Sequence, residues 1–503
     1  MTDILTVLDF PGIKQFVFGT NPVREIRGAS ALLELLNKEK IPRFLEDRLE
    51  KRYQPIFMGG GAGAFLVTNA TLQEIEDLMA DVDSIVHRET GNGIDIVWSS
   101  VEQTGAFNDA FRRAHILLGQ RKGRLRKAKP RTGSALLREC DSCSAAGVTK
   151  IWNDEGDNPE WICSQCWTKR EYRDKSPTWD QLREKLASGS SFVRPKDFHQ
   201  LGLKSMRQGY VALVYIDGDS MGRLIRRIES PKQYRLFSDV VDSSLREAAA
   251  DAVKSYALSA RKERGDTVSC DILLLGGDDL VMVVPADLAL PMSISICRSF
   301  QRLTKKQFSK QDFFDKPTCE NGLTVSAGIA IFKDRQPFRV VFDQAEDLLK
   351  SAKQRRSEDS SLEPYIDFAD VSQTRFVKLQ DLRRAEQGVG TGVELTFWPM
   401  SLTRSARFLD TAVELVKSGV ATSRIHAIGA VVEKERNVAF DTMRIIARAK
   451  NKERDSINHF LMENEMWPHI PWRLKKNVRS TGLLDLAVLY PHIAKKETRN
   501  ATV

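Results

Sequence analysis

The sequence lacks long apolar runs. No segment approaches the roughly eighteen apolar residues that a membrane-spanning helix needs. The N-terminus also lacks the basic, apolar and small-residue regions of a signal peptide. These absences exclude an integral helical membrane protein, and we expect a cytoplasmic protein that does not act at a membrane.

Cysteine is scarce, and four of the seven cysteines form two pairs. The pairs follow a Cys-x-x-Cys spacing and are separated by the nineteen residues 144–162. This spacing is typical of four thiolates around one structural Zn²⁺; disulfides are the alternative, less suited to a cytoplasmic chain. The predicted zinc ligands are Cys140, Cys143, Cys163 and Cys166. Cys270, Cys297 and Cys319 stand singly, and we expect them to be buried apolar residues.

The 503 residues are too many for a single core and suffice for three or four domains. The apolar content of 42% and the charged content of 28% indicate ordinary globular domains. A net charge of +9 is compatible with nucleotide or nucleic-acid partners without establishing them.

Residues 273–284 read Leu-Leu-Leu-Gly-Gly-Asp-Asp-Leu-Val-Met-Val-Val. This pattern predicts two buried strands joined by a turn that needs positive φ. The turn carries the carboxylates of Asp278 and Asp279, and carboxylate oxygens are preferred ligands of Mg²⁺ or Mn²⁺. Taken alone, the motif could equally be a solvated hairpin whose aspartates only tolerate the turn.

A second apolar run, residues 211–216, leads into Asp217-Gly218-Asp219-Ser220-Met221-Gly222 and then a helical pattern. A strand therefore ends in a carboxylate at the start of a helix, where backbone N–H groups face an anion. Because a two-metal site needs carboxylates from two neighbouring strands, we expect Asp217 and Asp278 to supply them.

Residues 323–331 predict a further strand, and residues 345–353 predict a helix with Lys350 and Lys353 close together. These lysines could contact triphosphate oxygens, although most helix lysines are simply solvated. The order strand, helix, strand, strand, helix, strand, helix predicts a ferredoxin-like palm.

The first hundred residues show a similar layout. We predict a strand at residues 13–18, a helix through residues 26–36, a Gly-Gly hairpin at residues 55–67, a helix at 71–79 and a strand at 93–98. Gly61 and Ala62 stand where Asp278 and Asp279 stand, and Gly19 lies near the place of Asp217. We interpret this as an internal duplication whose first copy has lost its carboxylates. A chance glycine-rich hairpin is the alternative.

The Asp-Gly-Asp-Ser-Met-Gly turn, the Gly-Gly-Asp-Asp hairpin, Ser326-Ala327-Gly328-Ile329 and Ala352-Lys353 together resemble the second palm of the large subunit of type III CRISPR–Cas effector complexes. Residues 24–30 resemble the first-palm signature of that family. A more distant resemblance is to the GGDEF diguanylate cyclases.

The resemblance implies an enzyme that makes cyclic oligoadenylates from ATP by two-metal catalysis when its complex binds target RNA. It implies metal-binding catalytic roles for Asp217, Asp278 and Asp279. The residues expected to contact nucleotide are Gly218, Asp219, Ser220, Met221, Gly276, Gly277, Ser326, Lys350 and Lys353. The implied partners are the small helical and backbone subunits, guide RNA and target RNA.

Many family members carry an N-terminal HD nuclease domain. This sequence has no His-Asp pair, so we expect no DNA cleavage by it.

The expected domains are a carboxylate-free first palm (1–120), a basic linker with the four-cysteine zinc-binding domain (121–205), a second palm (206–376) and an all-α C-terminal domain (377–503).

Residues 121–131 contain seven basic residues, which form either a solvated loop or a phosphate-contacting segment. The C-terminal helices carry basic residues and either dock on the small helical subunit or only stabilise the fold; these residues are Arg424, Lys434, Arg436, Arg444, Arg448 and Lys450.

Two further functions stay open from the sequence. One is a free-standing GGDEF-like cyclase that makes a dinucleotide without RNA. The other is a catalytically silent RNA-binding scaffold subunit whose Gly-Gly-Asp-Asp motif is vestigial.

Overall fold

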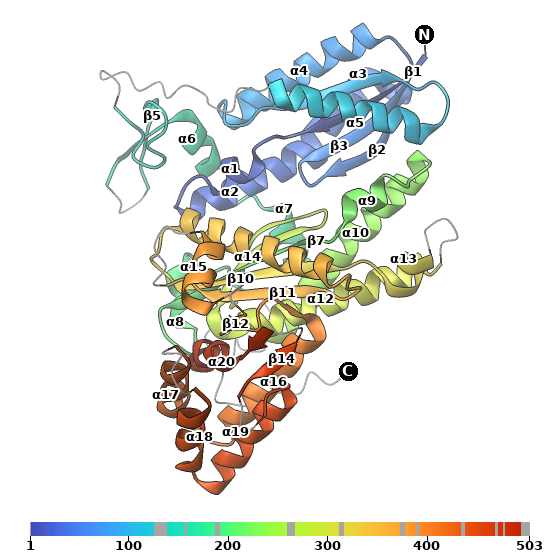
Figure 1. Ribbon diagram of the computed structural model, residues 1–503. Helices are drawn as coiled ribbons and strands as arrows, with labels where there is room; N and C mark the ends of the chain where they lie inside the picture. The colour runs from blue at the N-terminus through green and yellow to red at the C-terminus, as the bar shows by residue number, and fades with distance from the viewer. Residues whose placement is uncertain are drawn as a thin grey trace. The chain divides into compact units, whose positions relative to one another are not determined.

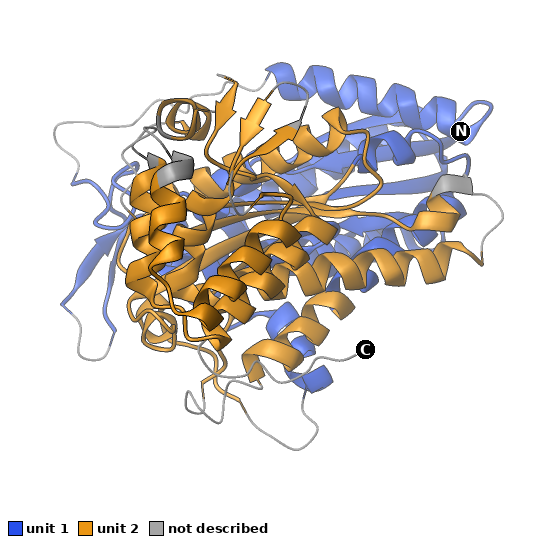
Figure 2. Cartoon of the chain, turned by 60° about the horizontal axis from the view of Figure 1, so that its bottom comes forward, with its two compact units in different colours: residues 1–189, 220–246, 273–279 blue, residues 190–219, 247–272, 280–503 orange. Residues whose placement is uncertain are grey.

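The computed structural model describes residues 2–124, 138–154, 158–186, 192–258, 267–310, 316–372, 378–388, 392–433, 438–467, 471–475 and 478–493. The chain forms two compact units, which Figure 2 shows in different colours. The first unit comprises residues 1–189, 220–246 and 273–279, and the second comprises residues 190–219, 247–272 and 280–503.

The first unit contains a four-stranded antiparallel sheet in the order β2-β3-β1-β4. Figure 1 labels β1, β2 and β3 of this sheet. Its strands are β1 (Thr2–Asp9), β2 (Tyr53–Gly59), β3 (Ala62–Ala70) and β4 (Val97–Glu102). Its helices are α1 (Ile13–Phe18), α2 (Val23–Leu35), α3 (Ile41–Leu49), α4 (Leu72–Thr90) and α5 (Phe107–Arg124). Helix α2 continues as the π-helical turn η1 (Leu36–Lys40), and η2 (Glu50–Arg52) precedes β2. The order of the elements and the sheet order are those of a ferredoxin-like palm.

The strand predicted at residues 13–18 is wrong, because those residues form α1. Ile13, Phe16 and Val17 are apolar at positions i, i+3 and i+4, which is the spacing of a helix face. The first strand is instead β1, whose Ile4 and Leu5 are both fully buried. The last strand of this sheet, β4, runs from Val97 to Glu102 and therefore lies later than residues 93–98.

A small module follows the first palm. It contains the hairpin of β5 (Lys150–Trp152) and β6 (Glu160–Ile162), then α6 (Ser164–Glu171) and α7 (Pro177–Leu186). Helix α6 packs on α2 of the palm. Gly28 makes the close approach possible, since a Cβ there would lie 1.6 Å from the carbonyl oxygen of Lys169.

The second palm has a six-stranded sheet in the order β13-β11-β10-β7-β9-β8. Its strands are β7 (Tyr210–Gly218), β8 (Asp271–Gly276), β9 (Asp279–Pro285), β10 (Val325–Lys333), β11 (Tyr365–Asp370) and β13 (Met400–Ser401). Its helices are α8 (Phe198–Leu203), α9 (Met221–Ile225), α10 (Pro231–Ala252), α12 (Ala286–Phe308), α13 (Lys316–Asn321), α14 (Phe338–Glu358) and α15 (Leu379–Gln387), with the π-helical η3 (Val253–Leu258) after α10.

The order β8-β9-β7-β10 repeats the order β2-β3-β1-β4 of the first sheet, so two ferredoxin-like palms are confirmed. Helices α12 and α14 pack on the central strands β7 and β10, which explains why these strands are almost entirely buried.

The C-terminal region is helical, as predicted (Figure 1). Its elements are α16 (Leu402–Lys417), α17 (Thr422–Glu433), α18 (Val438–Ala447), α19 (Asn451–Glu463), α20 (Leu483–Leu489) and η4 (Tyr490–His492). It also contains a small sheet in the order β12-β15-β14, which the sequence analysis does not predict. These strands, β12 (Val393–Glu394), β14 (Arg473–Lys475) and β15 (Val478–Ser480), are too short to show a period-two pattern.

Candidate active site and zinc site

Strand β7 brings Asp217 to the end of a buried run. Residues 210–216 of this strand are all buried, whereas Asp217 is partly exposed. The strand pairs with β10 through Ser326 and Asp217, and its last pair with β9 joins Ile216 and Leu280. Asp217 therefore follows that last pair along β7, and Asp279 precedes it along β9.

Lys353 of α14 is the partner of Asp217. Its ammonium forms an ion pair with the Asp217 carboxylate and donates a hydrogen bond of 2.6 Å to the carbonyl oxygen of Gly218. Both side chains of the ion pair keep more than a quarter of their surface exposed, so water and ligands have access to them. The Lys353 ammonium therefore places a positive charge beside Asp217, at the C-terminal end of β7.

Asp219 is buried and has a different environment. Ser326 donates its hydroxyl hydrogen to the Asp219 carboxylate at 2.8 Å, and Arg356 lies 3.3 Å from the same group. The Asp219 N–H donates to the Thr324 carbonyl at 2.9 Å. Burial raises the pKa of Asp219, while Arg356 and Ser326 oppose that shift. These contacts fix the backbone that follows Asp217. They also mean that the Ser326 hydroxyl donates its hydrogen to Asp219 rather than pointing to a ligand.

The Gly-Gly-Asp-Asp stretch forms a tight hairpin turn. Strand β8 ends at Gly276 and β9 begins at Asp279. Gly277 has φ of +62°, which explains the glycine at this position. Asp278 and Asp279 are both partly exposed. The structure thus confirms the predicted strand, turn and strand.

The residues after Asp219 begin a short helix. Ser220 has φ of +61° and precedes α9, which starts at Met221. The first intrahelical hydrogen bonds run from the N–H groups of Arg223 and Leu224 to the Ser220 carbonyl oxygen. The amides of Ser220, Met221 and Gly222 come before these bonds, as expected at a helix start.

The two lysines predicted on α14 have different surroundings. Lys350 is exposed and pairs with Glu346 at 3.0 Å on its own helix. Lys353 contacts Asp217 instead. Of the two, Lys353 is the one that the structure brings to the end of β7.

The first palm retains one carboxylate that the sequence analysis missed. In the β1–β3 pairing Asp9 opposes Ala62. Ala62 begins β3 as Asp279 begins β9, so Ala62 is equivalent to Asp279. Asp9, and not Gly19, is therefore equivalent to Asp217. The missed signal is that Asp9 ends an apolar run, as Asp217 does.

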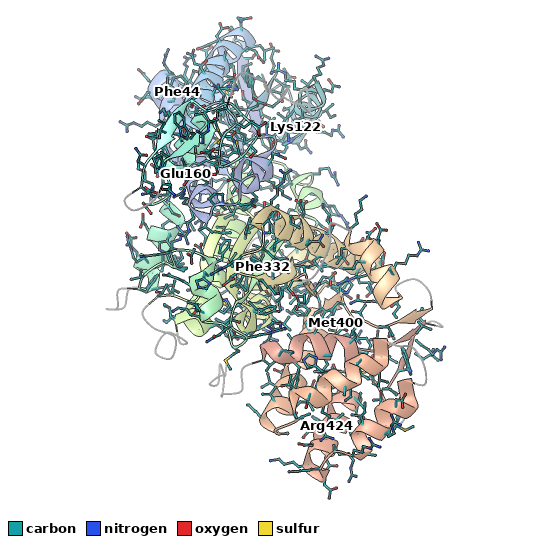
Figure 3. The ribbon with its side chains drawn as sticks, turned by 90° about the vertical axis from the view of Figure 1, so that its left-hand side faces the viewer. Phe44, Lys122, Glu160, Phe332, Met400 and Arg424 are labelled. Atoms are coloured by element: carbon teal, nitrogen blue, oxygen red, sulfur yellow. The ribbon has the colours of Figure 1, made fainter. Side chains whose placement is uncertain are left out.

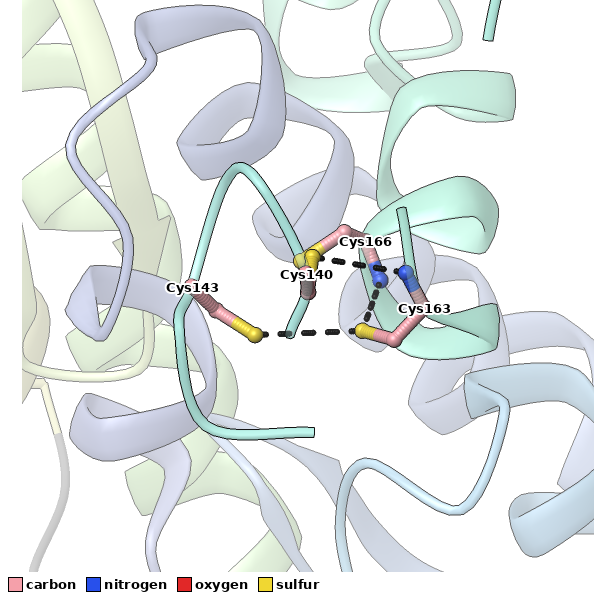
Figure 4. A group of neighbouring side chains, drawn as sticks. All are labelled: Cys140, Cys143, Cys163 and Cys166. Carbon is pink, nitrogen blue, oxygen red and sulfur yellow. Dashed lines mark hydrogen bonds between the residues drawn. The ribbon is translucent and has the colours of Figure 1, made fainter. Parts of the chain in front are cut away.

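The four paired cysteines form one cluster, as predicted (Figure 4). Their sulfur atoms lie within 4.8 Å of one another, and the Sγ atoms of Cys143 and Cys163 are 3.8 Å apart. Tetrahedral Zn–S bonds of about 2.3 Å require sulfur atoms about 3.8 Å apart. The donor set and spacing fit a structural zinc ion.

A buried ion network attaches the zinc module to α2. Arg170 of α6 lies 2.8 Å from Glu25 of α2 and 2.6 Å from Glu160, which Figure 3 labels. The side chains of Glu25 and Arg170 are completely buried. Ser142, between the first two cysteines, also donates to Glu25 at 2.7 Å. A completely buried ion pair therefore joins the module to the first palm.

The basic stretch at residues 121–131 is described only as far as Arg124, and residues 125–131 lie outside the described residues. Within it, Arg121 pairs with Glu76 at 2.9 Å. In the C-terminal region Arg424 pairs with Glu453 at 3.3 Å and Arg444 with Asp441 at 3.3 Å. Lys434 and Arg436 lie outside the described residues.

No helix among the described residues is long and apolar enough to cross a membrane.

Residues 210–362 match the family model of the Cas10/Cmr2 second palm domain, and residues 3–125 match that of Csm1 subunit domain B. No curated protein matches the chain.

Solved structures of Csm1–Csm4 cassettes share the fold. The chain is 14% identical to one in complex with pppApApA, with a TM-score of 0.56 and coverage of 97% of this chain and 69% of that chain. It is 15% identical to one in complex with AMPPNP, with a TM-score of 0.55 and coverage of 98% and 70%. For the first two matching cassettes, the chain covers only 53% and 65% of the matched chain. By its two matched palm segments, this chain belongs to the family of large, two-palm subunits of type III CRISPR effector complexes.

Proposed function

We propose that this chain is an RNA-activated nucleotidyltransferase that makes cyclic oligoadenylates from ATP, within a CRISPR antiviral effector complex in the cytoplasm. The observation that carries the proposal is the ion pair of Asp217 with Lys353 at the end of a buried palm strand. The fold is shared with cassettes solved in complex with AMPPNP, pppApApA and cA3, which supports an adenine nucleotide as substrate.

Asp217, Asp278 and Asp279 are the residues that would hold Mg²⁺ or Mn²⁺, since their carboxylate oxygens suit hard cations. Divalent cations bound there would activate a ribose hydroxyl and neutralise charge at the α-phosphate and the departing pyrophosphate. Asp219 is not assigned this task, because its carboxylate is buried and lies against Ser326 and Arg356. Its role is to fix the chain after Asp217.

Lys353 contributes the positive charge. Its ammonium neutralises Asp217 in the structure. With a cation bound to that carboxylate, the lysine would be free to contact triphosphate oxygens. The amides of Ser220 and Met221 offer further donors for phosphate, as helix starts commonly do. Gly218, Gly276 and Gly277 would let the nucleotide approach the backbone closely.

The first palm would hold the second ATP. Joining two nucleotides requires both in near-attack geometry, so a second binding palm is useful even without a metal site. Lys122 lies 2.7 Å from Asp9, so a basic group stands at this strand end as well. The turn residues Gly61 and Ala62 supply no carboxylate.

Zn²⁺ at the four cysteines would be structural, because four sulfur ligands leave no open position. The partners proposed for the chain are a Csm4-like subunit, the small helical and backbone subunits, and guide and target RNA. The similar structures, in which Csm1 is paired with Csm4, support the first of these.

The test is to assemble the complex with guide RNA and matching target RNA and to add labelled ATP or GTP. We expect phosphatase-resistant products, identified by mass as cyclic oligoadenylates, from ATP. Product from GTP, or a dinucleotide made by the chain without RNA, would favour the GGDEF-like cyclase. No product under any condition would indicate the scaffold.

A further inference from the structure

Two side chains of α10 hold the Gly-Gly-Asp-Asp turn. Gly277 donates its N–H to the Asp242 carboxylate at 2.9 Å, and Arg246 donates to the carbonyl oxygen of Leu275 at 2.9 Å. Asp242 and Arg246 are themselves joined by an ion pair of 2.8 Å. We call Asp242 and Arg246 the turn clamp. It holds the backbone on both sides of Gly276.

The turn clamp is charged, and its arginine is largely buried. The Arg246 side chain is 12% exposed and that of Asp242 is 28% exposed. Burial raises the pKa of Asp242, but Arg246 and Lys38 outweigh it and lower the pKa overall. Charge-assisted hydrogen bonds in such surroundings are stronger than neutral ones and fix geometry more tightly.

The same clamp contacts the first palm. Glu34 of α2 lies 3.4 Å from Arg246, and Lys38 of η1 lies 3.7 Å from Asp242. Thr178 of α7 joins them, donating to Glu34 at 2.8 Å and accepting from Arg246 at 3.0 Å. Each charge of the clamp therefore has an opposite charge on the first palm.

The two hairpin turns also lie next to each other. A Cβ placed on Gly60, in the β2–β3 turn, would lie 3.7 Å from the carbonyl oxygen of Gly276 and 3.8 Å from the Cα of Gly277. The β2–β3 turn therefore lies against the backbone that precedes Asp278. The clamp and this contact restrain the Gly-Gly-Asp-Asp turn from two sides.

We propose that Asp242 and Arg246 are positioning residues for Asp278 and Asp279, and that Glu34 and Lys38 link their geometry to the first palm. The proposal rests on the metal-binding role proposed above for these carboxylates. The direction of Asp278 depends on the Gly277 backbone, whose N–H the clamp holds. Residues that orient metal ligands in this way typically change metal affinity or activity by about ten- to a hundredfold when mutated.

The test compares Asp242→Ala with Asp239→Ala, a change at an exposed residue one turn earlier on α10. For each assembled complex, the rate is measured against Mn²⁺ concentration and against ATP concentration. We expect Asp242→Ala to raise the Mn²⁺ concentration for half-maximal rate by about tenfold or more, with little change in the KM for ATP. Asp242→Asn, which keeps an acceptor for Gly277, should recover part of the loss, and Asp239→Ala should match wild type. An unchanged Mn²⁺ dependence in Asp242→Ala would overturn the proposal.

The link to the first palm is tested with Glu34→Gln against Glu39→Gln, since Glu39 is exposed in η1. We expect Glu34→Gln to shift the Mn²⁺ dependence in the same direction, and to add little in an Asp242→Ala background because both changes act on one network. Fully additive effects would contradict the link.

A second readout separates this inference from the proposed function. Hydrogen exchange of peptides covering residues 273–280 is measured in wild type, Asp242→Ala and Asp239→Ala. Exchange should accelerate only in Asp242→Ala. If wild type makes no product, the proposed function fails; faster exchange in Asp242→Ala alone would then still establish the clamp but not its role in metal binding, and equal exchange would refute the clamp itself.

Discussion

Lys122, near the end of α5, lies 2.7 Å from the carboxylate of Asp9 at the end of β1. In the second palm, Lys353 near the end of α14 forms the corresponding ion pair with Asp217 at the end of β7. Helix α5 follows β4, just as α14 follows β10, so both residues of each pair come from equivalent elements. The duplication therefore extends beyond strand order to an aspartate–lysine pair, and the two palms differ at the hairpin turn.

The first prediction concerns that difference. Changing both Asp278 and Asp279 to alanine should abolish nucleotide condensation while the protein stays folded, because Asp217 alone cannot hold two cations. The measurement is product formation from labelled ATP by the assembled complex, with circular dichroism as the check on folding. Product at the wild-type rate would contradict the two-metal assignment.

The second prediction uses the two lysines of α14. Lys353→Ala should lower product formation by about ten- to a hundredfold, the scale expected for losing a charged hydrogen-bond partner. Lys350→Ala should change it little, because Lys350 is exposed and pairs within its own helix. Rates are measured at saturating and limiting ATP. Equal loss in the two variants would remove the distinction between them.

The third prediction concerns zinc. Elemental analysis of fresh, reduced protein should find one Zn²⁺ per chain, bound by the four clustered cysteines. Cys140→Ser should lower the thermal unfolding temperature more than Cys319→Ser, since structural zinc contributes directly to folding. The effect should reach the first palm, because Arg170 and Glu25 bury a shared ion pair. Metal-free wild-type protein of normal stability would exclude the site.

The fourth prediction is a pH dependence. His492 is almost completely buried, and burial lowers its pKa to about 4 from 6.5. As the pH falls, His492 is therefore protonated in the unfolded chain before it is protonated in the folded chain. The stability that neutral His492 contributes is fully present above about pH 6.5 and is lost as the pH falls toward 4. The loss is at most about 3 kcal/mol.

His492→Phe should remove this part of the acid sensitivity. The phenyl ring keeps the shape that packs against Tyr210, with ring centroids 5.3 Å apart in wild type. The measurement is urea unfolding at pH 7 and pH 4.5, with the exposed His426→Gln as control. A wild-type difference between the two pH values that persists unchanged in His492→Phe would show that other groups cause it.

The sequence predicts the second palm and the zinc cluster well because their signals are local. The run 211–216 ending in Asp217 and the Gly-Gly-Asp-Asp turn each fit within about a dozen residues, and the cysteine spacing is short. Strand β1 is missed because Asp9 is followed by Phe10 and Pro11 rather than by a glycine-rich turn. The turn clamp could not be predicted, since Asp242 stands 35 residues before the Gly277 that it contacts, in a helix that shows only core periodicity.

The last prediction is that the isolated chain is a poor enzyme and that target RNA, read through partner subunits, activates it. The first palm lacks carboxylates at its turn, so product depends on how its nucleotide is presented to the second palm. Partner subunits and RNA can favour the productive arrangement only if they bind it more tightly than the unproductive one. The helical C-terminal region gives the partners one place at which to act.

The gating prediction is checked by the initial rate of oligoadenylate synthesis under three conditions: the lone chain, the lone chain with RNA, and the assembled complex with matching target RNA. We expect a steep rise only in the third condition. A shift from 1% to 99% productive arrangement requires about 5.5 kcal/mol of differential binding, which a large assembly supplies more readily than RNA contacting one chain. In the Glu34→Gln complex, activation should be weaker than in Glu39→Gln, because Glu34 connects the first palm to Arg246. Equal rates for the lone chain and the RNA-loaded assembly would reject gating and favour a free-standing cyclase.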